Sequence, residues 1–311
     1  QYKLAKLLSE NLPENLTTTY FTNSGTEAIE GAMKLSKRIN GRSEIIYCKD
    51  SYHGSTQGSL SIMGNEEYKS KYRPLLPNCK QIIFNNIQSL ENISSKTSAV
   101  IIETIQGASG FKIAEEKFLI ELNKRCKKHE VLIIIDEIQT CFGRTGKLFG
   151  FENTPIVPDI LCIAKGMGGG FPIGAFISSW ENMNKLTFDP KLGHITTFGG
   201  HPVNCAASLA TLKYIIKNKT INSIKKKEKL FRKLLVHKKI KSITGKGLML
   251  SLDLYNNKNT NKIVKMCMND GLLLFFFLFN DSSIRISPPL TISEQEINQG
   301  CEIILQNLNK L

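Results

Sequence analysis

Three short apolar runs give the clearest pattern in the chain, and none shows the alternation of a half-exposed strand. They occupy residues 99–102, 131–135 and 159–164. Their apolar, largely β-branched composition is typical of strands that are buried on both faces. Between the first two runs, residues 115–130 place apolar side chains among Lys and Glu, which predicts an amphipathic helix. The pattern therefore predicts a strand–helix–strand unit and a largely parallel sheet.

An ionisable residue follows each of these runs. Glu103 follows the first, Asp136 the second and Lys165 the third. The carboxyl ends of parallel strands lie at one edge of a sheet, where α/β proteins bind ligands. A single acid after a strand is usually a cap or turn residue, but three ionisable ends at one edge favour a functional site.

A possible anion site lies near the start of the chain. Residues 20–22 lead into a turn and then into a helical stretch over residues 28–38. Ser24 and Glu27 have the spacing of a capping box. Gly25 permits close approach to the backbone, and the helix start offers free N–H groups to a phosphate. This motif alone favours a plain helix cap, so a phosphate site needs support from elsewhere.

The character of the sequence changes after residue 217. Lys-rich helical sequence is followed by apolar segments at 248–252, 272–279 and 284–286, and by helices near 260–270 and 294–310. We expect an α/β fold with a large domain over residues 1–217, whose last helix spans about 203–217, and a smaller C-terminal α+β domain over residues 218–311. The chain opens at Gln1 within helix-like sequence, so we also expect an absent N-terminal segment.

The composition is that of a globular protein, with 41% hydrophobic and 22% charged residues in a chain of 311. The formal net charge is +14, but the Lys runs at 225–227 and 238–239 contain no aromatic residues that would stack on bases. No apolar run is long enough to span a bilayer. The sequence therefore predicts neither a nucleic-acid nor a membrane partner, and its positive field favours an anionic substrate or cofactor.

Eight cysteines are scattered along the chain, with no Cys-x-x-Cys pair and no two histidines at metal-ligand spacing. Several of these cysteines lie within apolar runs. We therefore expect no metal site, and we expect reduced, buried thiols in a cytoplasmic protein.

Burying a charged lysine side chain at the end of a strand costs free energy, so a lysine at such a position suggests a function. Desolvation lowers the pKa of such a lysine, and the neutral amine can form a Schiff base with an aldehyde. Pyridoxal phosphate chemistry needs this lysine, a carboxylate for the pyridine nitrogen, a phosphate site and an aromatic side chain against the ring. Lys165, Asp136, residues 24–26 and Tyr52 fill these four roles. Taken singly, each has an ordinary structural interpretation, and only their combination points to the cofactor.

A set of short motifs runs along essentially the whole chain in a fixed order. The motifs are Asn23-Ser24-Gly25-Thr26-Glu27-Ala28, Tyr52-His53-Gly54, Glu103-Thr104-Ile105-Gln106-Gly107, Ile135-Asp136-Glu137-Ile138-Gln139-Thr140, Phe142-Gly143-Arg144-Thr145-Gly146, Ala164-Lys165-Gly166, Thr196-Thr197-Phe198-Gly199-Gly200-His201-Pro202 and Arg285-Ile286-Ser287-Pro288-Pro289-Leu290. This set resembles the class III, fold-type I aminotransferases that depend on pyridoxal phosphate. That group includes the acetylornithine, ornithine and 4-aminobutyrate aminotransferases.

The resemblance implies a role for each residue around the cofactor ring. Lys165 holds pyridoxal 5'-phosphate as a Schiff base and, once released, moves the proton of the reaction. Asp136 pairs with the pyridine nitrogen, and Gln139 contacts the 3′-oxygen of the ring. Tyr52 stacks on one face of the ring, and His53 belongs to the same cofactor-binding segment.

The resemblance also implies how the phosphate is bound. Ser24, Gly25 and Thr26 bind it, and Thr197 is supplied by the neighbouring subunit of a homodimer with shared active sites. Glu103 helps to position the surroundings of the ring.

Two positions depart from the acetylornithine and ornithine branches of this family. Arg285 matches the residue that grips a substrate carboxylate, a task that suits a bidentate guanidinium. Those branches usually place an Arg where this chain has Ser55. They also place a Glu, which can neutralise the C-terminal Arg, where this chain has Ala108. We therefore predict that Arg285 is unpaired and available for carboxylates.

The activity implied by the resemblance is transamination. An amino group would pass from an amino acid, with an ω-amine like that of acetylornithine or ornithine favoured, to 2-oxoglutarate by a ping-pong route. Ser55 and Ala108 leave open another enzyme on the same scaffold, such as a decarboxylase, racemase or aminomutase. A truncated, inactive relative is a further alternative, because the family has N-terminal residues that this chain lacks.

Overall fold

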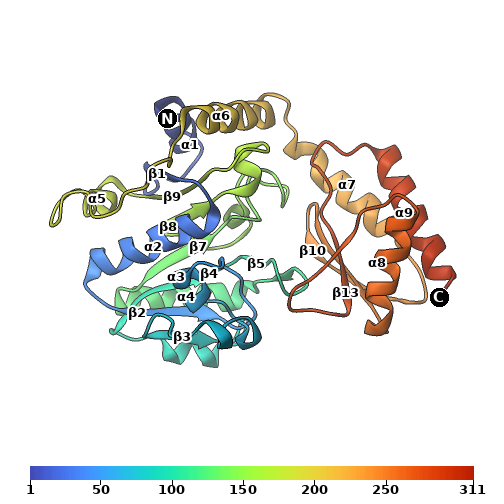
Figure 1. The fold of residues 1–311 in the computed structure, drawn as a ribbon, viewed down its shortest axis with the longest axis horizontal. Helices are drawn as coiled ribbons and strands as arrows, with labels where there is room; N and C mark the ends of the chain where they lie inside the picture. Colours follow the sequence, from blue (N-terminus) through green and yellow to red (C-terminus); the bar gives the residue numbers. More distant parts are fainter.

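The main sheet has seven strands in the order β1-β9-β8-β7-β4-β2-β3. The computed structural model describes residues 1–311, and Figure 1 shows this sheet with its helices. Strands β8, β7, β4, β2 and β3 pair in parallel, whereas β9 is antiparallel to both β8 and β1. The predicted, mostly parallel α/β sheet is therefore confirmed. Its strands are β1 (Thr18–Thr22), β2 (Glu44–Cys48), β3 (Cys79–Ile82), β4 (Thr97–Ile102), β7 (Leu132–Asp136), β8 (Ile160–Ile163) and β9 (Gly174–Ser178).

The buried strands take part in two hydrophobic cores, one on each face of the sheet. In β4, Ile102 lies in the larger core and Ile101 in the other. Because the side chains of a strand point alternately to opposite faces, burial of both faces removes the polar alternation. Helix α4 (Glu116–His129) contributes to the first core and helix α2 (Gly25–Asn40) to the second. The predicted strand–helix–strand unit is therefore β4-α4-β7.

A second, four-stranded sheet with helices of its own lies beside the seven-stranded sheet (Figure 1). We call the seven-stranded sheet with its helices the first unit, and the four-stranded sheet with its helices the second unit. Its four strands have the order β10-β11-β13-β12, and all its pairs are antiparallel. Its helices contribute to a third core cluster together with β11 and β13. The elements are β10 (Ile240–Lys246), β11 (Met249–Leu254), β12 (Phe275–Phe276), β13 (Ser283–Ile286), α7 (Ile221–Leu234), α8 (Thr260–Asn269) and α9 (Glu294–Asn309).

The apolar run at 272–279 forms less strand than its composition suggests. Only Phe275 and Phe276 pair with β13. Phe277 is buried instead, and its ring packs edge-on against Phe111 with the centroids 4.8 Å apart. The run is thus divided between pairing at the edge of the sheet and packing against the first unit.

Shorter elements complete the chain, and α6 leads from the first unit toward α7 (Figure 1). None of the helices combines the length and the apolar character needed to cross a bilayer. The remaining helices and strands are α1 (Tyr2–Ser9), α3 (Gln57–Ser61), α5 (Trp180–Asn184), α6 (Pro202–Lys217), β5 (Ile105–Gln106) and β6 (Lys112–Ile113). The 3₁₀ helices are η1 (Glu66–Tyr68), η2 (Ser70–Tyr72), η3 (Gln88–Asn92), η4 (Gly150–Asn153), η5 (Lys165–Gly168) and η6 (Asn257–Asn259).

Helix α2 begins in the turn that carries the predicted phosphate site. Ser24 caps it, and the Ser24 hydroxyl oxygen accepts a hydrogen bond from the Glu27 N–H at 3.4 Å. The Glu27 carboxylate does not return to Ser24 but accepts from the N–H and the side-chain amide of Asn23. In a capping box this carboxylate would accept from the Ser24 N–H, so that part of the prediction is wrong. Its partner is instead the preceding residue, Asn23, which supplies two donors.

Helix α2 rests on β9 through a close contact between Gly31 and the ring of Phe176. A Cβ at position 31 would lie 2.3 Å from that ring, so the backbone can approach this closely only at a glycine. Phe176 is fully buried. This contact holds the helix whose first turn carries the predicted phosphate site.

We expect Phe176→Ala to lower the free energy of unfolding by about 3–5 kcal/mol, because it opens a cavity beneath α2. Urea denaturation followed by circular dichroism measures this change. The control Val236→Ala removes an apolar side chain that is 75% exposed. The control should cost less than about 0.5 kcal/mol, and equal losses in the two variants would contradict the packing described here.

Candidate active site

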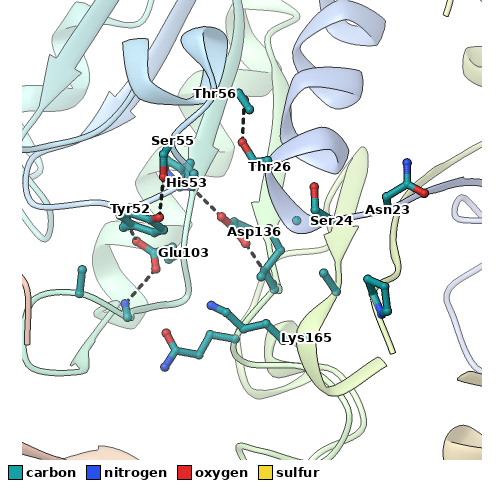
Figure 2. A pocket seen from close by; sticks show the side chains of 18 of the residues that line it. Asn23, Ser24, Thr26, Tyr52, His53, Ser55, Thr56, Glu103, Asp136 and Lys165 are labelled. Carbon is teal, nitrogen blue, oxygen red and sulfur yellow. Dashed lines mark hydrogen bonds and ion pairs between the residues drawn. The ribbon is translucent and has the colours of Figure 1, made fainter. Parts of the chain in front are cut away.

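A cavity of about 730 Å³ opens at the carboxyl ends of β4, β7 and β8. This volume lies in the range of cavities that bind small molecules and cofactors. Figure 2 shows side chains from several elements converging on it. Every predicted site residue except Thr197 lines this cavity, namely Ser24, Gly25, Thr26, Tyr52, His53, Glu103, Asp136, Gln139, Lys165 and Arg285.

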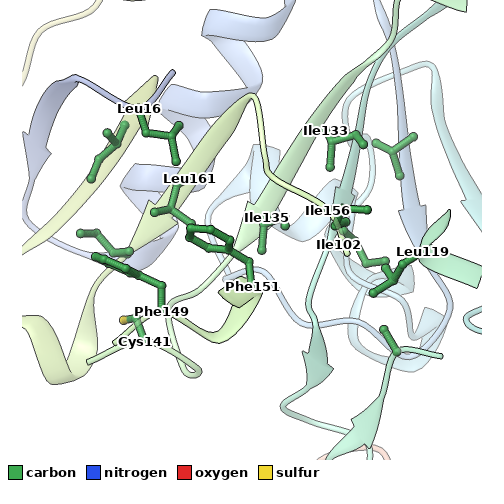
Figure 3. Packing of buried hydrophobic residues seen from close by; sticks show 14 of the residues in the cluster. Leu16, Ile102, Leu119, Ile133, Ile135, Cys141, Phe149, Phe151, Ile156 and Leu161 are labelled. Carbon is green, nitrogen blue, oxygen red and sulfur yellow. The ribbon is translucent and has the colours of Figure 1, made fainter. Parts of the chain in front are cut away.

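The three ionisable strand ends meet here, as expected for parallel neighbours. Glu103 follows β4, Asp136 ends β7, and Lys165 comes shortly after β8. Apolar packing beneath them holds the strands in place. Ile135 lies in the same core cluster as Leu161 of β8, as Figure 3 shows. The core therefore positions the residues that carry the charge.

Asp136 is buried, and both of its carboxylate oxygens accept hydrogen bonds. Its Oδ2 lies 2.8 Å from Nδ1 of His53, and its Oδ1 accepts from the Ile138 N–H at 3.0 Å. Burial lowers the pKa of His53, but the hydrogen bond and the charge of Asp136, helped by Glu103, outweigh burial and raise it. The other ring nitrogen of His53 is buried without a partner. His53 therefore orients Asp136 within the cavity.

Glu103 joins two loops at the rim of the cavity. Its carboxylate accepts hydrogen bonds from the Tyr52 N–H at 3.2 Å and the Gly107 N–H at 2.8 Å. Burial raises the pKa of Glu103, the charge of His53 opposes this shift, and the charge of Asp136 adds to it. The Tyr52 side chain is thereby held over the cavity, as Figure 2 shows.

Lys165 stands in the cavity on unusual backbone. Its φ of 48° lies in the left-handed region, which residues other than glycine rarely adopt. Solvent reaches the side chain, yet the cavity walls surround it, and this desolvation lowers its pKa. The charges of Asp136 and Glu103 oppose the shift, and the charge of Arg285 adds to it. The lowered pKa makes the neutral, nucleophilic amine more available.

The turn before α2, where we predict a phosphate site, carries N–H groups without a partner in the protein. The N–H groups of Gly25 and Thr26 lie in the first turn of the helix and have no acceptor within the protein. Both residues line the cavity. A Cβ at position 25 would lie 2.7 Å from the Ile138 side chain, so glycine suits this close approach. The turn can therefore hold a phosphate at this end of the cavity.

A hydroxyl network behind this turn was not expected from the sequence. The Thr26 hydroxyl lies 2.7 Å from that of Thr56 and 2.6 Å from that of Ser59. Thr56, which also lines the cavity, donates to Glu30 at 2.6 Å. The network joins α2 to the segment that begins α3. Because its members come from separate segments, no local spacing predicts it.

Arg285 lies against two aromatic rings that also contact each other. Its guanidinium carbon lies 5.3 Å from the ring centroid of Phe111 and 4.8 Å from that of Phe277. Nη2 donates to the Gly107 carbonyl at 2.8 Å, whereas the buried Nε has no hydrogen-bond partner. The availability of Arg285 for a substrate carboxylate stays a prediction. No motif or spacing in the sequence predicted that these two aromatic residues would contact Arg285.

Thr197 lies exposed on the loop before α6 and does not line the cavity of its own chain. The side-chain amide of Asn23 donates to the hydroxyl of the adjacent Thr196 at 3.0 Å, so this loop is tied to the phosphate turn. The role of Thr197 at a neighbouring subunit stays a prediction.

The residues present fit pyridoxal phosphate. An accessible amine, an oriented buried carboxylate, free N–H groups at a helix start and the ring of Tyr52 share one cavity. The chemistry of the cofactor requires this combination: a lysine for its aldehyde, an acid for its ring nitrogen and an anion site for its phosphate.

Known proteins with the same sequence pattern support this fit. The family model described as aminotransferase class-III matches residues 1–308. Acetylornithine aminotransferase from Caldanaerobacter subterraneus subsp. tengcongensis is 38% identical over 323 residues, which cover 100% of this chain and 80% of that protein. The LysW-aminoadipate semialdehyde/glutamate semialdehyde transaminase of Sulfolobus acidocaldarius is 34% identical, with 99% of this chain and 79% of that protein covered.

A solved structure has the same fold. Ornithine aminotransferase from Toxoplasma gondii, described with partial occupancy of PLP at its active site, superposes with a TM-score of 0.90 at 25% identity. The match covers 99% of this chain and 75% of that one. With the family model matching residues 1–308, this chain belongs to the class-III aminotransferases and is an enzyme that depends on pyridoxal phosphate.

Proposed function

We propose that this enzyme transfers an amino group from an amino acid to a 2-oxo acid by a ping-pong route at the cavity around Lys165. The observation that carries the proposal is that Lys165 shares one cavity with the Asp136–His53 pair and with the phosphate turn. An ω-amine of the acetylornithine or ornithine type is the first donor to test, because relatives at 34–38% identity are named acetylornithine aminotransferases. The sequence-based prediction of 2-oxoglutarate as acceptor is tested alongside.

Lys165 would hold the cofactor and move a proton. Bound pyridoxal phosphate supplies an aldehyde and an electron-withdrawing ring. The lowered pKa of Lys165 favours the neutral amine, which would hold the cofactor and, once released, would accept the proton of the donor carbon. In the overall exchange the donor carbon loses its amino group and one hydrogen, and the acceptor carbonyl carbon gains them. The acceptor carbon gives up its oxygen as water, and water supplies the carbonyl oxygen of the donor carbon.

The remaining predicted residues would bind and orient the cofactor. Asp136, held by His53 and the Ile138 N–H, would keep the ring nitrogen protonated. Tyr52 would cover one face of the ring, and Gln139 would contact its 3′-oxygen. Ser24, Gly25 and Thr26 would hold the phosphate, Glu103 would fix the loop of Tyr52, and Arg285 would bind a substrate carboxylate.

We propose a homodimer as the working form, with Thr197 reaching the cofactor phosphate of the neighbouring subunit. The exposure of Thr197 and its absence from its own cavity support this arrangement. We also propose that residues 1–217 form the cofactor-binding domain and 218–311 the small domain, which the separate core of the second sheet supports. The free state of all eight cysteines supports a cytoplasmic location.

We expect Lys165→Ala to abolish the visible absorbance of bound pyridoxal phosphate and the formation of amino acid from an oxo acid. The reason is that no other amine of this chain lines the cavity. Absorbance spectra and mass spectrometry of the products measure both effects. The control Lys241→Ala, on the exposed side of β10, should keep both properties. If the unsubstituted enzyme were a decarboxylase, racemase or aminomutase, it would show the absorbance of the bound cofactor but would form no amino acid from the oxo acid.

The His53–Asp136 pair should make stability depend on pH. Because the pKa of His53 is raised in the folded protein, the pair contributes fully below the unfolded pKa of about 6.5. That contribution is lost as the pH rises through the raised folded value. We expect the difference in unfolding free energy between this protein and His53→Asn to shrink as the pH rises above about 6.5. A difference that stays constant or grows in urea denaturation would show that His53 is not protonated in the fold.

Mixed dimers test the proposed position of Thr197. Thr197→Ala should weaken the affinity for pyridoxal phosphate by about tenfold or more, because it removes a hydrogen bond to a charged group. A mixture of Thr197→Ala and Lys165→Ala chains should recover tight binding at about half of the Lys165 sites, since these sites receive an intact threonine from the other chain. Fluorescence titration measures both effects, and no recovery would place Thr197 at the site of its own chain.

A further inference from the structure

The cavity is lined by three basic side chains, and two of them already have a partner or a proposed role. Its basic side chains are Lys165, His53 and Arg285. Lys165 is the proposed attachment point of the cofactor, and His53 is bonded to Asp136 at 2.8 Å. Two carboxylates, those of Asp136 and Glu103, line the same cavity. Arg285 is therefore the one cation left for the carboxylate of a substrate.

Arg285 is prepared to receive one carboxylate. The rings of Phe111 and Phe277 hold its guanidinium, and the Gly107 carbonyl takes one hydrogen of Nη2. An arginine held in this way loses little conformational freedom when it binds a ligand. Its remaining N–H groups can bind a carboxylate without displacing an acid of the protein.

The other lining side chains suit an uncharged group. Ser55 lies at the mouth of the cavity, where its hydroxyl is 3.0 Å from that of Tyr52, and Phe171 and Leu278 add apolar surface. The loop at 194–201, which we propose reaches the neighbouring site, contains neither Lys nor Arg. A second carboxylate on the substrate would lose hydration here without gaining a cation.

We propose that the 2-oxo acid of this enzyme carries a single carboxylate, bound by Arg285, and an otherwise uncharged body, so that 2-oxoglutarate is a poor acceptor. This inference rests on the proposed function and specifies its acceptor. The oxo carbon gains an amino group and a hydrogen and gives up its oxygen, and the donor undergoes the reverse change. The exchange therefore needs no outside oxidant or reductant.

One half-reaction tests the proposal without knowledge of the donor. The whole chain, loaded with pyridoxamine phosphate, is mixed with 2-oxopentanoate or with 2-oxoglutarate. These acids have the same length and differ only in a terminal methyl group or carboxylate. The spectrum of the cofactor and the amino acid formed both report the rate. Calorimetric titration of each acid into Lys165→Ala gives their relative affinities without turnover.

We expect 2-oxopentanoate to react at least about tenfold faster than 2-oxoglutarate at low concentration, and to bind more tightly by a similar factor. Ser55→Arg should raise the rate with 2-oxoglutarate by about tenfold or more, because it supplies the missing cation. The matched control Ser55→Met adds length without charge and should not produce this gain.

Two results would count against the proposal in different ways. If 2-oxoglutarate reacts as fast as 2-oxopentanoate or faster, the single-carboxylate acceptor is overturned while transamination stands. If neither acid yields an amino acid although the cofactor is bound, the proposed function fails and the inference fails with it.

Discussion

The site depends on keeping a lysine amine and two carboxylates together in a partly desolvated cavity. Moving a charged group out of water costs free energy. In this cavity each of the three groups offsets that cost in a different way. Asp136 is bonded to His53 and to a backbone N–H, Glu103 accepts two backbone N–H groups, and Lys165 shifts toward its neutral form. The parallel sheet makes this possible because neighbouring strands end at the same edge.

The second unit contributes to the same cavity through Arg285. This residue lies on β13, and its Nη2 bonds to Gly107, which belongs to the first unit. Phe277 of the second unit packs on Phe111 of the first, and the guanidinium lies against both rings. One of the contacts that join the two units therefore also positions Arg285 at the cavity.

Local sequence patterns predicted the site residues at the strand ends. They could not predict contacts between segments that are distant in sequence. Glu103, Asp136 and Lys165 could be found because each follows a buried run, and a parallel sheet must bring such ends together. The pair of aromatic rings beside Arg285 and the hydroxyl network of Thr26 join segments that are far apart in sequence, so no spacing within one segment reveals them. The apolar composition of residues 272–279 did not show which residues pair as a strand, because Phe275 and Phe276 pair with β13 whereas Phe277 packs on Phe111.

The proposed chemistry requires Lys165 to be the residue that bonds covalently to the cofactor. Incubation with pyridoxal phosphate, reduction with borohydride and peptide mass spectrometry would locate that bond directly. We expect one pyridoxyl group per chain, on the peptide that contains Lys165. A modification spread over the exposed lysines, or none at all, would contradict it.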